Sequence, residues 1–110
     1  MTRHPESSAD VERWFREQLV RLWPAGLGSL SLRRSPCVRA KCHACETGEQ
    51  HPSHVLYGRR NGRRFALYIP DALAPEVRRA LVNGRALQKL LYEAARRYAE
   101  ALKREYARQR

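Results

Sequence analysis

Apolar side chains in the first quarter of the chain recur at intervals of three and four residues, which places them on one face of a helix. They are Val11, Trp14, Phe15, Leu19 and Leu22, with Gln18 among them. The run Ser7-Ser8-Ala9-Asp10 provides a capping start, and Pro24 and Gly26 provide an end. We therefore expect an amphipathic helix over residues 8–23.

A different pattern, with alternating positions, extends from His54 to Ile69 around the dipeptide Asn61-Gly62. This dipeptide favours a two-residue type I′ turn, because both of its residues accept positive φ angles. We expect a two-stranded antiparallel β-hairpin over residues 54–69. The turn fixes its register. The expected pairs are Arg60–Arg63, Arg59–Arg64, Gly58–Phe65, Tyr57–Ala66, Leu56–Leu67 and Val55–Tyr68.

Alternation along the two strands of this hairpin sorts the side chains onto two faces. The face that we expect to belong to the core holds His54, Leu56, Gly58, Phe65, Leu67 and Ile69. The opposite face holds Val55, Tyr57, Arg59, Arg64, Ala66 and Tyr68.

Helical spacing returns after the hairpin. Asp71 is placed to cap a helix that starts with Pro75, and apolar residues continue at intervals of three and four to Tyr106 across Asn83-Gly84. Ion pairs between positions i and i+4 are expected for Glu93–Arg97 and Glu100–Arg104. We expect one long helix over about 75–107 within a helical region 71–107, with a bend at Gly84 as an option.

These elements predict an α+β fold: an N-terminal helix, a loop over residues 33–53, a two-stranded hairpin and a long C-terminal helix. At 110 residues the chain is expected to form a single small domain over 1–110. This length excludes a multi-domain enzyme. No apolar run approaches the roughly 20 residues that span a bilayer, and the first ten residues lack the apolar run of a signal peptide. We therefore expect a soluble cytoplasmic protein.

The net charge of the chain indicates what kind of partner it binds. The chain has 22 Lys and Arg against 11 Asp and Glu, a net charge of +11 and a pI near 10.6. Four basic and four acidic residues balance over residues 1–32, whereas eight against two give +6 over residues 33–64 and ten against five give +5 over residues 65–110. An acidic partner is expected, and the middle third carries the highest net charge.

The three cysteines of the chain, Cys37, Cys42 and Cys45, lie close together and are followed by His51. This spacing suits tetrahedral zinc, so residues 33–53 are expected to form a zinc-bound loop. A Cys₃His set fills all four coordination positions of the metal, so the site is expected to be structural. For the fourth ligand, His51 is favoured over His43, which adjoins Cys42, and over His54, which lies inside the expected strand. The alternatives are three free cysteines, or a redox pair Cys42/Cys45. The redox pair is disfavoured because no strand is expected before it.

These residues carry a resemblance. Gly28-Ser29-Leu30-Ser31, the cysteine cluster, the step His51-Pro52, the hairpin that ends in Tyr68-Ile69-Pro70 and the charged helix resemble a family of small prokaryotic proteins known only as a domain of unknown function. The resemblance covers about residues 22–105. The chain departs from the family by one residue between the last two cysteines, by His-Pro in place of His-Gly-Pro, and by His54 and Val55 where aromatic residues are usual. The family implies an architecture and no activity.

Basic residues surround the expected hairpin turn, and the register sets like charges opposite one another, which is unfavourable by itself. Together with the outer tyrosines and the basic residues near the cysteines, they form a candidate nucleic-acid interface. Its expected members are Arg33, Arg34, Arg39, Lys41, Tyr57, Arg59, Arg60, Arg63, Arg64 and Tyr68. The alternatives are an arginine-rich solvated surface, and tyrosines packed beneath the N-terminal helix.

No catalytic constellation is found in the sequence: there is no nucleophile–base set with strand context and no glycine-rich phosphate loop. We therefore expect a non-enzymatic, zinc-stabilised protein that binds DNA or RNA through the basic hairpin. The alternative is a small adaptor or accessory subunit that docks by its helices on a larger nucleoprotein complex, or pairs with a second copy through the long helix. Packing of the long helix against the N-terminal helix is the simplest use of its apolar stripe.

Overall fold

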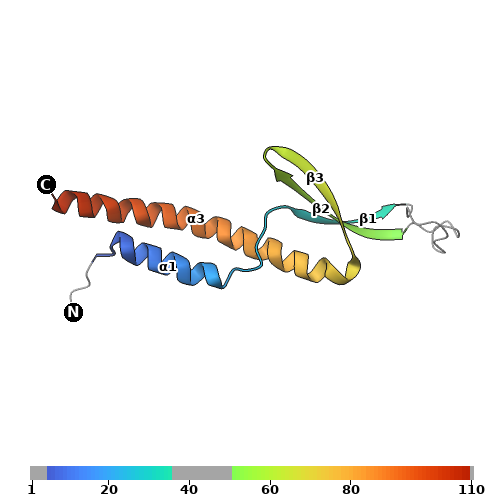
Figure 1. Cartoon of the computed structure of the whole chain (residues 1–110), viewed down its shortest axis with the longest axis horizontal. Helices are drawn as coiled ribbons and strands as arrows, with labels where there is room; N and C mark the ends of the chain where they lie inside the picture. Colours follow the sequence, from blue (N-terminus) through green and yellow to red (C-terminus); the bar gives the residue numbers. More distant parts are fainter. Residues whose placement is uncertain (1–4, 36–50, 110) are drawn as a thin grey trace. The chain divides into compact units, whose positions relative to one another are not determined.

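The computed structural model of the chain describes residues 5–35 and 51–109. Its elements are α1 (Ser8–Val20), β1 (Ser29–Ser35), β2 (His51–Arg60), β3 (Arg63–Ile69), a short 3₁₀ turn η1 (Asp71–Leu73) and α3 (Ala74–Arg108), as Figure 1 shows. The α+β class is confirmed. The chain divides into two compact units, a sheet unit (Gly26–Leu81) and a helical unit (Met1–Ala25 with Val82–Arg110). The single domain expected from the length stays a prediction.

The start of α1 is a reciprocal capping box. The Ser7 N–H donates to the Asp10 carboxylate (3.0 Å), and the Asp10 N–H donates to the Ser7 hydroxyl oxygen (3.1 Å). Both bonds satisfy donors that a helix start leaves unpaired. The expected helix is confirmed, but it ends at Val20 rather than 23. The Arg21 N–H bonds back to the carbonyl groups of Gln18 and Leu19 at that end.

In the helical unit, α1 lies antiparallel along the later part of α3 (Figure 1). The side chain of Glu105 accepts bonds from the Ser8 N–H (2.8 Å) and hydroxyl (2.9 Å), and at the other end the Asn83 amide donates to the Pro24 carbonyl (2.8 Å). The buried core consists of Val11, Leu90 and Ala101, with Gly84 also buried. The packing of α1 against the long helix is therefore confirmed.

The long helix α3 begins and ends within one residue of its expected bounds. It runs without a break through Asn83-Gly84, so this dipeptide does not interrupt the helix. Asn83 instead supplies the side-chain bond to the Pro24 carbonyl.

The sheet unit contains a three-stranded antiparallel sheet in the order β1-β2-β3. All six expected pairs between β2 and β3 are confirmed. The turn that joins them has φ angles of 52° at Asn61 and 78° at Gly62, both in the left-handed region that a type I′ turn requires.

The prediction of a two-stranded hairpin is wrong by one strand. Residues 29–35 form β1, which pairs with β2 from Ser29 opposite Tyr57 to Ser35 opposite His51. The alternation Ser29-Leu30-Ser31-Leu32 is the period of a strand, but it is short and contains no β-branched or aromatic residue.

One face of the sheet is covered by η1 and the first turns of α3. Ile69 from this face is buried together with Ala74 and Leu81. The expected core face is confirmed at this end only, because Phe65 and Leu67 on the same face are exposed (39% and 54%).

Asp71 does not cap a helix with its side chain as expected. Its carboxylate lies 3.0 Å from Nδ1 of His54, and Nη2 of Arg78 lies 3.3 Å from Nε2 of the same ring. Because a guanidinium only donates, Nε2 accepts and Nδ1 carries the proton that is donated to Asp71. His54 thus ties the sheet to the helix that covers it.

Candidate nucleic-acid interface

The three strands contain six arginines and no aspartate or glutamate. The arginines are Arg33, Arg34, Arg59, Arg60, Arg63 and Arg64. A sheet with cations and no carboxylate of its own has a positive potential that its strands do not neutralise.

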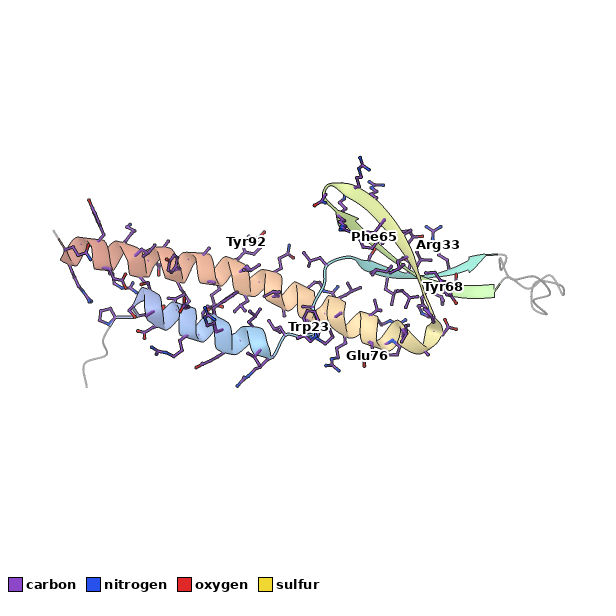
Figure 2. The ribbon with its side chains drawn as sticks, in the orientation of Figure 1. Trp23, Arg33, Phe65, Tyr68, Glu76 and Tyr92 are labelled. Carbon is purple, nitrogen blue, oxygen red and sulfur yellow. The ribbon has the colours of Figure 1, made fainter. Side chains whose placement is uncertain are left out.

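The face opposite η1 and α3, which we call the open face, holds five of the ten predicted interface residues. By the strand register it holds Ser29, Ser31, Arg33, Ser53, Val55, Tyr57, Arg59, Arg64, Ala66 and Tyr68. Three arginines and two tyrosines thus share one face of a three-stranded sheet. Figure 2 labels Arg33 and Tyr68, which come from different strands of this sheet.

The β2–β3 hairpin extends beyond the third strand. Because β1 begins at Ser29 opposite Tyr57, the pairs Gly58–Phe65, Arg59–Arg64 and Arg60–Arg63 have no partner on β1. The end of the hairpin is a two-stranded ribbon with arginines on both of its faces. We call Arg59, Arg60, Arg63 and Arg64 the tip arginines.

All four tip arginines are exposed, and within the described part of the chain none of them forms an ion pair. Like charges placed directly across two strands repel each other. The four cations are therefore kept together without an ion-paired carboxylate among the described residues, and an anionic ligand would relieve the repulsion.

Aromatic side chains lie beside these cations on the open face. The guanidinium carbon of Arg33 lies 5.3 Å from the ring centroid of Tyr57, a cation–π contact that joins β1 to β2. Tyr57 is half-buried, whereas Tyr68 is 52% exposed. The alternative in which both tyrosines are packed away is therefore wrong for Tyr68.

Two shallow hollows adjoin the ribbon. The larger, about 610 Å³, is lined by Leu27, Gly28, Ser29, Tyr57, Gly58, Arg59, Arg64 and Phe65. The second, about 560 Å³, lies at the turn and is lined by Arg60, Asn61, Arg63, Arg64 and Phe65. Both are wide open and border the tip arginines, so an extended anion can reach them.

The remaining predicted interface residues lie at or beyond the end of the described strands. Arg34 lies in β1 opposite Pro52, while Arg39 and Lys41 lie outside the described residues.

Of the predicted zinc ligands, Cys37, Cys42 and Cys45 lie outside the described residues, as does His43. His51 is the first residue of β2 and pairs with Ser35, the last residue of β1. The chain therefore enters and leaves the cysteine segment at neighbouring positions of the sheet. Among residues 5–35 and 51–109, no three His, Cys, Asp or Glu side chains gather to hold a metal ion.

The expectation that no strand precedes the Cys42/Cys45 pair is wrong, because β1 ends at Ser35. The pair still differs in context from a thioredoxin-like motif, which adjoins a parallel βαβ unit, since β1 and β2 are antiparallel.

The helical unit contains a cluster around Arg97 whose long-range members are not apparent from the sequence. The Arg97 guanidinium lies 3.7 Å from the ring centroid of Trp14 and pairs with Glu6, and it lies 3.5 Å from Glu93. The expected Glu93–Arg97 pair is thus confirmed. The expected Glu100–Arg104 pair is wrong, because Glu100 pairs with Arg96 and Arg104 donates to the Glu6 carbonyl (2.6 Å).

Carboxyl groups in the helical unit have lowered pKa values. The hydrogen bond from Arg97 lowers the pKa of Glu6, and the Ser8 N–H and hydroxyl lower the pKa of Glu105. The Ser7 N–H in the capping box lowers the pKa of Asp10. All three carboxylates stabilise the folded helical unit in their charged form.

Comparison with protein-family models, with curated proteins and with solved structures finds no match for this chain. The family resemblance drawn from the sequence therefore stays an expectation. Within the described ranges, no helix is both long enough and apolar enough to cross a membrane.

Proposed function

We propose that the chain is a non-enzymatic, zinc-stabilised protein that binds nucleic acid through the basic β2–β3 hairpin. The observation that carries this proposal is the set of tip arginines on a ribbon that extends past β1, with no carboxylate in any strand. Guanidinium groups match the geometry of phosphate and pair with it through two hydrogen bonds, and a nucleic-acid strand presents phosphates in a row.

In this proposal zinc has a structural role. Cys37, Cys42, Cys45 and His51 would hold it, and a closed shell of thiolates and imidazole adds folding free energy to a small domain. The pairing of Ser35 with His51 supports the ligand set, because Cys37 follows Ser35 by two residues. His54 is less suited as the fourth ligand, since both of its ring nitrogens already have partners.

Fluorescence anisotropy with labelled DNA and RNA at several salt concentrations tests the binding. Replacing the four tip arginines with Ala should cost roughly 100-fold in affinity near 100 mM salt and lower the salt slope by about 3 to 4. The matched control removes the same charge from exposed positions of α3: Arg85, Lys89, Lys103 and Arg108 to Ala. Equal losses in both variants would mean that net charge alone binds, and would contradict the proposed site.

Metal analysis of the purified protein tests the zinc site separately. We expect stoichiometric zinc in the wild type, a loss of zinc in Cys42→Ser and in His51→Ala, and retention in His43→Ala. A folded, metal-free wild-type protein would contradict the site. Loss in His43→Ala with retention in His51→Ala would move the fourth ligand to His43.

A second candidate function is supported by the helical unit. A sector of α3 exposes Leu91 (53%), Tyr92 (75%), Tyr98 (48%) and Leu102 (42%), with Ala95 and Ala99 between them. Leu91, Ala95 and Tyr98 also line a hollow with Val11, Glu12 and Phe15 of α1. Figure 2 shows Tyr92 on the side of α3 that points away from α1. Such a surface fits an accessory subunit that docks on a larger nucleoprotein complex, or a homodimer.

The mass of the protein in solution separates these two uses of the helices. A dimer that dissociates in Leu91→Lys, with unchanged nucleic-acid binding, supports pairing of two copies. A monomer that fails to bind nucleic acid at about 50 mM salt but copurifies with a nucleoprotein complex supports the accessory subunit over the binding module.

A further inference from the structure

The open face differs from the tip in what it offers a ligand. The tip arginines place cations on both sides of a ribbon, whereas the open face adds two tyrosines and a row of serines. Phosphates need only the cations. The additional groups are therefore informative about which nucleic acid fits.

The tyrosine rings on the open face have small neighbours. Tyr57 lies between Ser29 on β1 and Ala66 on β3, and Tyr68 lies opposite Val55. Across two adjacent strands, Tyr57 and Tyr68 occupy diagonal positions, where side chains are about 7 Å apart. The residues directly opposite the two rings are therefore short or β-branched, and a flat group can approach the exposed Tyr68 ring.

Arg33 extends this arrangement to the third strand. Its guanidinium lies over the Tyr57 ring at 5.3 Å, so this planar cation forms part of the same aromatic surface. Guanidinium planes and tyrosine rings both stack with nucleic-acid bases.

In a duplex the faces of the bases are stacked on one another, and a protein reaches only their edges in the grooves. The tyrosines of a broad three-stranded face cannot enter a groove to stack. An unpaired strand, in contrast, exposes base faces to the tyrosines while its phosphates pair with arginines. The open face therefore suits a single strand better than a duplex.

We infer that the open face binds single-stranded nucleic acid, with a base stacked on Tyr68, a second base on the Tyr57–Arg33 pair, and phosphates at Arg59 and Arg64. This inference rests on the proposed function and names its substrate class. The serines Ser29, Ser31 and Ser53 lie on the same face and can donate or accept hydrogen bonds at base edges or a ribose hydroxyl. The chemistry is common to single-stranded RNA and DNA.

Competition between a labelled single-stranded oligonucleotide and a duplex of the same sequence tests this inference with the full-length, zinc-loaded protein. Single strands of RNA and of DNA are measured in separate arms. We expect the single strand to bind at least 10-fold more tightly than the duplex at the same salt concentration. Either single strand supports the inference, and tighter binding of RNA identifies a contact with the ribose hydroxyl.

Substitutions of Tyr68 test the stacking itself. Tyr68→Ala should weaken single-strand binding roughly 10-fold and leave duplex binding unchanged, while Tyr68→Phe should retain affinity because it keeps the ring. Tyr92→Ala is the matched control, since Tyr92 is also exposed but lies on α3 in the helical unit. Circular dichroism of each variant checks that the fold is kept.

A fluorescent probe gives an independent readout. In Tyr68→Trp, an added single strand should quench the new tryptophan beyond any change seen in the wild type, whose two tryptophans lie in the helical unit. Duplex binding that equals single-strand binding, with no effect of Tyr68→Ala, would overturn the inference and leave the proposed function standing. Failure to bind either nucleic acid would overturn both.

Discussion

The two units of this protein use arginine in opposite ways. In the helical unit, guanidinium groups pair with carboxylates, as in Arg13–Asp10, Arg16–Glu12, Arg96–Glu100 and Arg97–Glu6. In the sheet unit, the described strands contain six arginines and no carboxylate, and the tip arginines have no ion pair among the described residues.

A compositional bias toward arginine would affect both units alike, because it changes how many arginines are present and not which groups they pair with. The difference lies in where the acids are: the helical unit contains seven, and the three strands contain none. Several arginines of the helical unit are therefore used in ion pairs within the fold, whereas the tip arginines are available to a ligand.

The largest expected effect concerns the stability of the sheet unit. Gly28 has φ of +152°, and a Cβ there would lie 2.6 Å from the Tyr57 carbonyl oxygen, where β1 begins. Gly28→Ala should destabilise the sheet by about 2 kcal/mol because both the backbone conformation and the contact resist a side chain. Relative to the wild type, amide hydrogen exchange in this variant should become faster in β1 and β2 and change less in α1. Gly26→Ala, with nothing within 4 Å of its Cβ, is the control and should change little.

The next effect tests whether the paired arginines serve folding. Arg97→Ala should destabilise the helical unit by about 1.5 kcal/mol, since it removes the contact with Trp14 and the pair with Glu6. The adjacent Arg96 is exposed and pairs only with Glu100 among the described residues, so Arg96→Ala should cost about 0.5 kcal/mol or less. Urea unfolding followed by tryptophan fluorescence measures both variants. Nucleic-acid affinity that falls more in Arg97→Ala than in the tip-arginine variant would contradict the division of roles.

A third substitution makes the sheet unit resemble the helical unit. Ala66 lies on the open face, next to Arg64 along β3 and diagonal to Arg59. Ala66→Glu supplies the missing carboxylate and should weaken nucleic-acid binding roughly 10-fold with a stability change within about 0.5 kcal/mol. Ala66→Gln is the uncharged control, and an equal loss in both variants would show that size and not charge is responsible.

The smallest effect is the response to acid. Folding lowers the pKa values of Glu6, Asp10 and Glu105, so these groups contribute stability above their ordinary pKa values near 4 to 4.5. That contribution is lost as pH falls through the lowered values. The urea concentration at the unfolding midpoint of the helical unit, followed by tryptophan fluorescence, should decrease below about pH 4. Glu105→Gln should make this midpoint depend less on pH. Glu76→Gln, a change at an exposed carboxyl in the sheet unit, should leave the acid profile of the helical unit unchanged.

Local signals in the sequence determine much of this fold. Asn61-Gly62 specifies the turn, and with it the register that places Arg59 opposite Arg64 and Arg60 opposite Arg63. The capping residues Ser7 and Asp10 specify the start of α1. These features were predicted because each depends on residues a few positions apart.

Features that depend on distant residues were missed. The strand β1 pairs Ser29 with Tyr57, and without that register the contact between Arg33 and Tyr57 is not visible in the sequence. The prediction for Arg104 failed for the same reason, since its partner is the Glu6 carbonyl at the other end of the chain. The zinc ligands and the function stay predictions, since Cys37, Cys42 and Cys45 lie outside the described residues and no comparison bears on activity.

The pairing of Ser35 with His51 has a consequence for how this protein can vary. Because Ser35 and His51, which flank residues 36–50, occupy opposing positions on adjacent strands, their backbones lie only about 5 Å apart whatever the length of chain between them. The entropic cost of closing such a segment grows slowly, by about 0.6 kcal/mol for each doubling of its length. Insertions that keep Cys37, Cys42 and Cys45 are therefore expected to leave the register of β1 on β2 intact, so the length of the segment can vary while the proposed zinc ligands and the arginine-bearing sheet are kept.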